Sequence, residues 1–350
     1  MGRGVPHPRY KRKVMKVYEI HPGSTNLDGL RRGERPDPVP SWHEVLIRIR
    51  AASLNYRDHM IVCGKYFAPV TRPTIPLSDG VGEVVAIGPG VTRFRPGDRV
   101  AGAFFQVWFD GPPVRRHPAL GVPLDGTLAE YALLHEEGVV AIPSHLTFEQ
   151  AATLPCAGVT AWNALMASGK PLKAGETVLC LGTGGVSILA LQLAKAAGAR
   201  VLVTSSSDEQ LERARQLGAS GGINYKRYPD WEKEVERLTG GRGVDQIIEI
   251  GGAGTLDRSY QSIAFGGKVA LIGFLAGAAA QNNPVSLMLK SGSLQGIGVG
   301  STAMFEAMNR AIEANQIKPF VDTVFPFEEA TEAFRRLAAG DFVGKLVIAI

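Results

Sequence analysis

The sequence contains only three cysteines, Cys63, Cys156 and Cys180, among its 350 residues. Their odd number and wide spacing argue against a disulfide framework, and no two of them form a C-x-x-C pair. The chain also lacks an apolar run of about 20 residues that could span a bilayer, and its start lacks the apolar segment of a signal peptide. We therefore expect a cytoplasmic protein with reduced thiols and no membrane segment.

Strong charge and low complexity are absent as well. The formal net charge is +5, and 45% of the residues are hydrophobic and 20% charged, which is ordinary for a globular protein. Much of the positive charge lies in residues 1–13, which we interpret as a solvated basic tail, and we predict no nucleic-acid binding from it. The 42 glycines and 22 prolines follow no period and indicate many tight turns.

The rhythm of apolar residues changes part-way along the chain. Residues 14–142 form short apolar runs separated by glycine and proline, a pattern typical of an antiparallel, β-rich unit. A helical segment covers residues 148–167. From residue 176 onward, apolar strands alternate with amphipathic helices, and this alternation predicts a parallel sheet with helices on both faces.

The last part of the chain, after Ser301, is too short to form a domain. We expect it to return to the β-rich unit. The predicted fold class is therefore α/β, with a doubly wound, Rossmann-type parallel sheet domain inserted in a discontinuous β-rich domain. The inserted dinucleotide-binding domain would comprise residues 157–301, and the β-rich substrate domain residues 1–156 and 302–350.

A dinucleotide-binding fingerprint follows the apolar strand TVLCLG and opens the next predicted helix. Gly182 permits a tight turn, and Gly184 lets the backbone approach a pyrophosphate, whose charge then lies at the helix N-terminus. The third fingerprint position holds Ser187, which is small enough for close packing. This context predicts dinucleotide binding. The predicted contacts are Gly182, Thr183, Gly184, Gly185 and Val186.

The end of the following strand indicates which dinucleotide binds. An NAD-binding fold places an acid there, on the ribose hydroxyls, but this chain has Ser205 and Ser206. Their hydroxyls can accept a 2′-phosphate, with Arg213, Tyr225 or Lys226 adding cationic or phenolic contacts. We therefore predict NADP(H), with NADPH preferred over NADH. Asp208, directly after the serines, is interpreted as the N-cap of the next helix.

Four segments, LNYRD, LSDGVGEVVAIGPGVTRFRPGDRV, AATLPCAGVTAWNAL and LGTGGVS, carry a family resemblance. Together they resemble the zinc-independent, quinone-oxidoreductase-like (zeta-crystallin-like) branch of the medium-chain dehydrogenases/reductases. The resemblance covers nearly the whole chain after the basic tail. It implies that the β-rich domain is GroES-like and that two copies form a homodimer through the strand at residues 294–301.

The resemblance also implies that both zinc sites of the zinc-dependent members are missing. Where those members place their cysteine, histidine and cysteine ligands, this chain has Asn55, Ser78 and Cys156, with Asp79 in the position of a glutamate. One thiol cannot replace the roughly four N/S ligands of a zinc ion. We predict no zinc, and interpret Cys156 as a packed thiol, with a pocket thiol as the alternative.

Without zinc, hydrogen-bond donors have to stabilise the charge that develops on a substrate oxygen. The candidates are Asn55, which can donate from its amide, Tyr56, which can pass a proton, and Arg57, which can orient Asp58 or anchor the backbone. A structural ion pair between Arg57 and Asp58 is the alternative. Aromatic residues on loops are candidates for the walls of a substrate pocket. They are Tyr66, Trp108 and Phe109.

Cofactor contacts outside the fingerprint follow mainly from the resemblance. Several are glycines at strand ends, as expected for a ligand at the carboxyl edge of the sheet. Relatives often carry a lysine where this chain has Gln210. The expected contacts are Thr160, Gly251, Gly252, Gly273, Phe274, Gly298, Val299 and Lys345.

These observations predict an NADPH-dependent, zinc-free oxidoreductase that reduces the carbonyl or activated C=C bond of a small quinone- or enone-like molecule. One alternative is a metal-free, NADP-dependent alcohol dehydrogenase. Another is a crystallin-like or RNA-binding protein without enzymatic activity. Initial rates on enones, quinones and simple alcohols separate the two enzymatic hypotheses.

Overall fold

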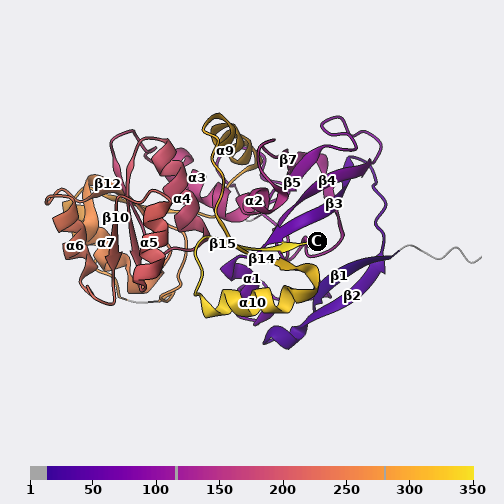
Figure 1. Ribbon diagram of the computed structural model, residues 1–350, viewed down its shortest axis with the longest axis horizontal. Coiled ribbons are helices and arrows are strands. Elements are labelled where there is room, and N and C mark those ends of the chain that lie inside the picture. The colour runs from indigo at the N-terminus through magenta and orange to yellow at the C-terminus, as the bar shows by residue number, and fades with distance from the viewer. Residues whose placement is uncertain (1–13, 115–116, 280) are drawn as a thin grey trace, which may run out of the picture.

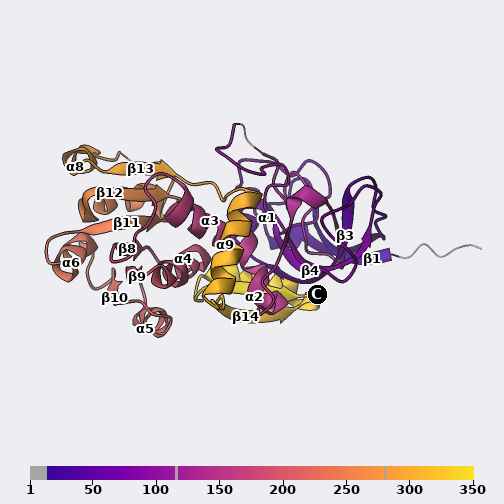
Figure 2. The ribbon, with the colours of Figure 1, turned by 90° about the horizontal axis from the view of Figure 1, so that it is seen from above.

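The computed structural model describes residues 14–114, 117–279 and 281–350, so the predicted basic tail lies outside the described residues. Two domains lie side by side, each built around its own sheet (Figure 1). Seen from above, α9 (Thr302–Ala314) and α2 (Phe148–Ala152) lie where the two domains meet (Figure 2). None of the described helices is both long and apolar enough to cross a membrane.

The first domain contains a sheet in the order β14-β15-β3-β4-β5-β7, with β6 pairing to β3. Along β3, Val45, Ile47 and Ile49 alternate inward and are buried, which is the period-2 pattern of a half-buried strand. The last strand of the chain pairs antiparallel with β3, so the chain returns to the first sheet. The bounds are β3 (Glu44–Ser53), β4 (Asp79–Ile87), β5 (Arg99–Gly102), β6 (Tyr131–His135), β7 (Val139–Ala141), β14 (Val321–Pro326) and β15 (Lys345–Ala349).

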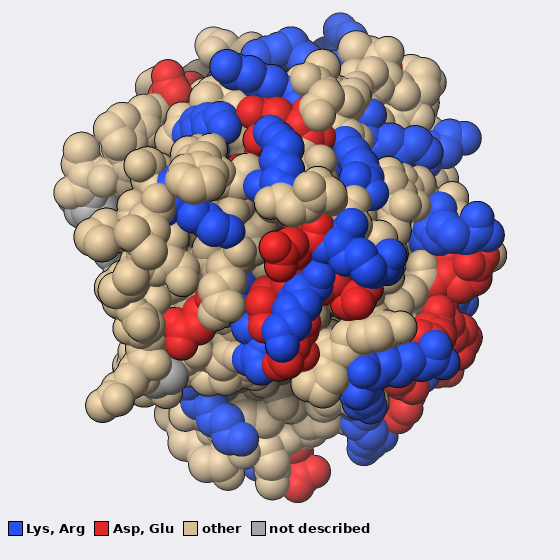
Figure 3. All heavy atoms as spheres, turned by 90° about the vertical axis from the view of Figure 1, so that its left-hand side faces the viewer, with Lys and Arg blue, Asp and Glu red and all other residues tan. Residues whose placement is uncertain are grey.

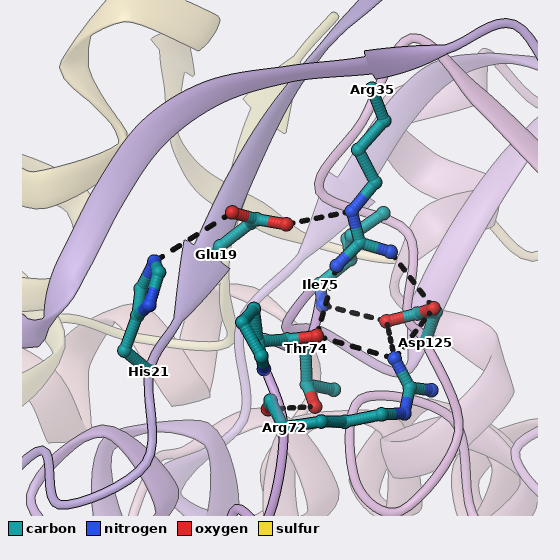
Figure 4. Close-up of polar contacts among 8 residues, drawn as sticks. Glu19, His21, Arg35, Arg72, Thr74, Ile75 and Asp125 are labelled. Atoms are coloured by element: carbon teal, nitrogen blue, oxygen red, sulfur yellow. Dashed lines mark hydrogen bonds and ion pairs between the residues drawn. The ribbon is translucent and has the colours of Figure 1, made fainter.

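A separate hairpin, β1 (Val14–Ile20) and β2 (Leu30–Pro36), packs beside this sheet. The sequence pattern did not predict β2, because LRRGERP has no apolar alternation. Ion pairs fasten it instead: Arg35 donates to Glu19 Oε1 at 2.6 Å and to Asp125 Oδ2 at 2.9 Å (Figure 4). Asp125 also accepts hydrogen bonds from Arg72, so one carboxylate joins the hairpin to a neighbouring loop.

The second domain is a six-stranded parallel sheet in the order β10-β9-β8-β11-β12-β13, which confirms the predicted doubly wound fold. Its strands are β8 (Thr177–Cys180), β9 (Arg200–Ser205), β10 (Gly221–Asn224), β11 (Val244–Glu249), β12 (Ile263–Leu271) and β13 (Ser293–Gly296). Its helices are α4 (Gly185–Ala196), α5 (Asp208–Gln216), α6 (Trp231–Leu238), α7 (Leu256–Ser262) and α8 (Val285–Leu289).

The remaining helices connect the domains or cover the first sheet. The predicted helical segment is formed by α2, the π-helix η3 (Leu154–Gly158), α3 (Val159–Trp162) and the π-helix η4 (Asn163–Ala167). The others are α1 (Tyr56–Val62), α10 (Ala330–Ala339) and the short 3₁₀ helices η1 (Leu27–Gly29), η2 (Glu136–Gly138), η5 (Gly252–Gly254) and η6 (Phe327–Glu329).

A buried lysine donates hydrogen bonds to the backbone carbonyls at the end of η4. Lys268, on β12, is fully buried, and its ammonium donates to the carbonyl oxygens of Ala164, Ser168 and Lys170 at 2.7, 2.9 and 2.7 Å. These carbonyls lie where a helix leaves its acceptors unpaired. Burial lowers the pKa of Lys268 to about 8. This lysine therefore has a structural role in the second domain.

Candidate active site

The candidate site lies where the segment before β15 meets the fingerprint loop. The Gly344 N–H donates to the Thr183 carbonyl at 2.8 Å, and Gly344 forms an isolated parallel bridge with Gly184. Residue 345, the next in the chain, is therefore placed directly beside the N-terminus of α4. The fold thus brings a side chain from the end of the sequence to the dinucleotide-binding motif.

A buried polar cluster forms at this junction around Lys345, whose side chain is only 4% exposed. Its Nζ donates to the Leu54 carbonyl and to Asn55 Oδ1, both at 2.6 Å. The third contact is to Asp79 Oδ2 at 3.4 Å. Lys345 was predicted to contact the cofactor, but its ammonium is engaged by Asn55 and Asp79, and only its alkyl chain passes the fingerprint residue Gly185.

Asn55 precedes α1 as its N-cap residue. Its backbone N–H donates to Asp58 Oδ2 at 2.8 Å, which closes the first turn of the helix. Its amide nitrogen Nδ2 is buried and has no hydrogen-bond partner among the described residues. A buried donor without an acceptor is costly, so this nitrogen is a candidate for contact with a bound molecule.

Two carboxylates flank the cluster. Asp79 is fully buried and accepts hydrogen bonds from the hydroxyls of Ser78 at 2.7 Å and Ser53 at 3.2 Å. Burial raises the pKa of Asp58 to about 6, although Arg57 and the Asn55 N–H counteract this rise. The Asp58 carboxyl therefore changes protonation just below neutral pH.

Arg57 anchors the backbone, which was one of its two predicted roles. Its Nη1 and Nη2 donate to the carbonyls of Leu120 and Val122 at 3.0 and 2.8 Å. The guanidinium also lies 5.0 Å from the ring centroid of Tyr66 and 4.9 Å from that of Phe104. The ion pair with Asp58 is longer, at 3.8 Å. With its charge held by carbonyls and rings, Arg57 supports the site without facing it.

The predicted aromatic wall is only partly exposed. Trp108, one of the predicted wall residues, is buried; it stacks on His117 and donates from Nε1 to the Gly111 carbonyl, so it does not face solvent. Phe109 is 46% exposed. The carbonyls of both residues accept the Thr302 and Ala303 N–H groups at the start of α9, at 2.9 Å each. This loop therefore lies against the segment that contains Val299.

Tyr56 is the first residue of α1 and is 47% exposed. Its ring lies 6.0 Å from that of His59. A tyrosine that is this exposed can meet a bound molecule or solvent, as a proton donor requires.

The fingerprint loop has the geometry of an anion site. Gly182 has φ +71°, which a glycine adopts without strain, and Gly184 has open space where a Cβ would stand. Among the described residues no side chain caps the N-terminus of α4, so its first N–H groups keep their capacity for a pyrophosphate. Ser187 donates to the Leu181 carbonyl at 2.6 Å, which ties the helix to the strand.

Ser205, the last residue of β9, is held by Gln210. Its Oε1 accepts hydrogen bonds from Ser205 Oγ at 2.7 Å and from Thr183 Oγ1 at 3.2 Å. The N-cap of α5 is Ser207 rather than Asp208, because the Ser207 hydroxyl accepts the Gln210 N–H and Asp208 is already the first helical residue. Asp208 instead accepts a hydrogen bond from Asn224.

Of the predicted 2′-phosphate contacts, Arg213 is directed elsewhere. Its Nη1 forms an ion pair with Asp322 at 2.8 Å, so its charge is already engaged. Tyr225 is 42% exposed and its N–H donates to the Ser205 carbonyl at 3.0 Å, which places it and the exposed Lys226 beside the serines. Of the two predicted cations, Lys226 follows Tyr225 directly, whereas Arg213 pairs with Asp322.

The loop after β11 is organised by Glu249, which the sequence pattern did not single out. Its buried carboxylate accepts the Gly251 and Gly252 N–H groups at 2.7 and 3.1 Å, and the Thr255 and Ser259 hydroxyls. Gly252 packs against Phe274, so predicted cofactor residues of two loops lie together. The sequence did contain a signal that could have identified Glu249: it is an acidic residue at the end of the apolar run VDQIIE.

Val299 adopts a left-handed backbone conformation, with φ +57°. For a β-branched residue this is strained, and such strain concentrates at functional sites. Asn163 holds it through a 2.6 Å hydrogen bond to the Val299 carbonyl. Gly298, next to Val299, has open space where a Cβ would stand. Thr160, another predicted cofactor contact, donates its hydroxyl to the Cys156 carbonyl within its own helical segment.

Two family models match the chain: an alcohol dehydrogenase GroES-like domain at residues 41–144 and a zinc-binding dehydrogenase model at residues 185–314. A zinc-type alcohol dehydrogenase-like protein from Schizosaccharomyces pombe is 43% identical over 341 residues, covering 95% of this chain and 99% of the relative. The chain belongs to the medium-chain dehydrogenase/reductase family. This family membership, predicted from four motifs, is confirmed.

Relatives and solved structures place this medium-chain dehydrogenase/reductase among oxidoreductases. Human quinone oxidoreductase is 29% identical over 319 residues, covering 89% of this chain and 90% of the relative. A Sinorhizobium meliloti 1021 structure assigned as an alcohol dehydrogenase has 41% identity, a TM-score of 0.90 and coverage of 97% and 99%. An NAD-dependent alcohol dehydrogenase has 33% identity, a TM-score of 0.88 and coverage of 96% and 99%. The mycobacterial Rv1454c complexed with NADPH has 28% identity, a TM-score of 0.79 and coverage of 96% and 100%.

The residues of this dehydrogenase/reductase do not fit a zinc ion. No group of three or more His, Cys, Asp and Glu side chains in the described part of the chain could hold a metal. Cys156 is the only thiol at the three positions where zinc-dependent members place their ligands, beside Asn55 and Ser78. The Lys345 ammonium lies 2.6 Å from Asn55 Oδ1, so a positive charge already occupies the place beside this residue where a zinc ion would have to bind.

A nicotinamide dinucleotide does fit the residues present. The open space at Gly184 and the uncapped start of α4 suit a pyrophosphate. Ser205 ends β9, and Tyr225 and Lys226 follow the neighbouring strand β10, where the adenosine ribose would be held. The Gly298 and Val299 segment lies against the substrate-side loop that carries Phe109.

Proposed function

We propose that this chain is a cytoplasmic, zinc-free, NADPH-dependent oxidoreductase that reduces the carbonyl or activated C=C bond of a quinone- or enone-like substrate. The observation that carries the proposal is the buried Asn55 Nδ2, a hydrogen-bond donor without an acceptor among the described residues, at the junction with the fingerprint loop. The cytoplasmic location rests on the three free cysteines.

The chain's own side chains would stabilise and protonate the substrate. When bound, the nicotinamide supplies the hydride that reduces the substrate. Asn55 donates from Nδ2 to the substrate carbonyl oxygen, on which negative charge develops. A proton then completes the reduction, from the exposed hydroxyl of Tyr56 or from water. Phe109 and Tyr66 exclude water from the reacting atoms.

The preference for NADPH is supported by the groups at the end of β9. Ser205 and Ser206 leave no acid to repel a 2′-phosphate, and Lys226 adds a positive charge. The mycobacterial structure with NADPH supports this cofactor, whereas the NAD-dependent alcohol dehydrogenase represents the alternative.

Binding and turnover measurements test the proposal directly. We expect NADPH to quench the tryptophan fluorescence of the purified protein at lower concentrations than NADH, and to support reduction of enones or quinones. Prolonged dialysis against a chelator should leave that activity unchanged. No NADPH binding would refute the proposal, activity on simple alcohols alone would favour an alcohol dehydrogenase, and loss of activity with a chelator would contradict the zinc-free assignment.

We also propose that two copies pair through β13, which is an edge strand of the parallel sheet. Large apolar side chains beside it are exposed: Met288 is 68%, Leu289 66% and Leu294 42% exposed. In Figure 3, charged side chains cover the centre and right of this end of the molecule, whereas the left part is mostly uncharged. An apolar strip along an unpaired edge suits a two-fold partner.

Light scattering tests this pairing. The wild-type protein should have twice the mass of one chain at micromolar concentration, and Leu294→Arg should shift it to a monomer because two arginines would face each other across the two-fold. Val324→Arg, a similarly exposed strand position in the other domain, is the control and should leave the mass unchanged. A monomeric wild-type protein would contradict the proposal.

A further inference from the structure

We infer that Lys345 is a positioning residue that acts through Asn55: its buried ammonium orients and polarises the amide that donates to the substrate oxygen. The inference rests on the proposed function, and it assigns the cation of this site to a side chain from the end of the sequence. The expectation that Lys345 contacts the cofactor is the alternative that the experiment separates from it.

The first step is the orientation of the Asn55 amide. A lysine ammonium only donates hydrogen bonds, so the amide atom that faces Nζ at 2.6 Å has to be the oxygen Oδ1. Nδ2 is then the end of the amide left over, and it is this atom that is buried without an acceptor among the described residues. Without Lys345, the amide could rotate and present its oxygen to the substrate instead.

The second step is the strength of the donor. An ammonium bound to Oδ1 withdraws electron density from the amide, and a hydrogen bond made by one end of a polar group strengthens the bond made by the other. Burial of the cation increases this effect, because water does not screen it. Asp79, at 3.4 Å and itself held by Ser53 and Ser78, offsets the cost of burying the charge.

The third step is how the fold leaves room for the lysine. A Cβ at Gly185 would lie 2.5 Å from Lys345 Cδ, so only a glycine there lets the alkyl chain pass. The strand register brings Lys345 and Asn55 together. The strand β15 begins at Lys345 and pairs with β3, and Asn55 lies two residues after the end of β3. Gly185 thus makes room for the lysine in addition to its place in the fingerprint loop.

The test compares Lys345→Met with the double variant Lys345→Met/Asp79→Asn, which removes both buried charges. We expect kcat to fall about 10²-fold in both, while the Kd for NADPH, measured by fluorescence, stays within about twofold. The double variant should regain part of the thermal stability that the single variant loses. Lys268→Met is the matched control: it also removes a buried lysine held by carbonyls, and should lower stability while leaving kcat unchanged.

Two outcomes would overturn the inference: wild-type kcat in the double variant, which would make the lysine only a counter-charge, or a loss confined to NADPH affinity, which would make it a cofactor contact. A measurement that does not depend on catalysis separates these from a failure of the proposed function. In ¹⁵N-asparagine-labelled protein, Lys345→Met should move the side-chain amide signals of Asn55, assigned through Asn55→Ser, and leave those of Asn163 unchanged. Unmoved Asn55 signals would refute the contact whether or not NADPH binds.

Discussion

Asn55→Ser is expected to lower kcat by about 10²- to 10³-fold, the usual cost of removing one hydrogen-bond donor from a site where oxyanion charge develops. The serine side chain is shorter than that of asparagine and has no amide, so it would not replace the Nδ2 donor. It is, however, a good N-cap residue, so α1 should keep its start. Because the donor acts mainly on the charged transition state, kcat should fall more than KM rises. Steady-state rates with an enone or quinone measure the effect.

Asn309→Ser provides the control for losing a buried amide. Asn309 lies on α9 and its Nδ2 donates to the Ala141 carbonyl at 2.8 Å, away from the candidate site. Its replacement should lower stability by about 1 kcal/mol and leave kcat unchanged. If Asn55→Ser changed only KM, or only stability as in the control, Asn55 would not be the donor to the developing charge.

Ser205→Asp is expected to reverse the cofactor preference by lowering NADPH affinity about 10²-fold or more, because a carboxylate would face the 2′-phosphate at close range. Ser205 is buried, but its Oγ already accepts the Ser207 N–H at 3.2 Å, and the Gln210 amide can rotate to donate to the new carboxylate. Fluorescence titration with both cofactors measures the two dissociation constants.

The same variant contains its own control, because NADH lacks the 2′-phosphate. Its affinity should stay the same or improve, since an acid at the end of this strand can accept hydrogen bonds from the ribose hydroxyls. Equal losses for both cofactors would indicate a local disturbance and not phosphate recognition. A wild-type protein that prefers NADH would contradict the interpretation of the serines.

Local sequence patterns were sufficient to predict the structure where it depends on a single helix, strand or turn. The alternation of strands and helices after residue 176 predicted the parallel sheet, and the fingerprint at Gly182 was confirmed as a strand-to-helix turn. The same approach missed β2, whose charged sequence is held by Arg35 and its partners, and it assigned the N-cap of α5 to Asp208 instead of Ser207. Those features depend on contacts that a short window does not contain.

The sequence by itself therefore determined the family, the parallel sheet and the turn at the fingerprint loop, because each follows from patterns within short stretches of the chain. The tertiary structure alone decided which partner each charged side chain contacts: Arg213 pairs with Asp322, Arg57 donates to backbone carbonyls, and Lys345 donates to Asn55. Lys345 and Asn55 are 290 residues apart in sequence, and only the return of β15 to β3 brings them within a hydrogen bond.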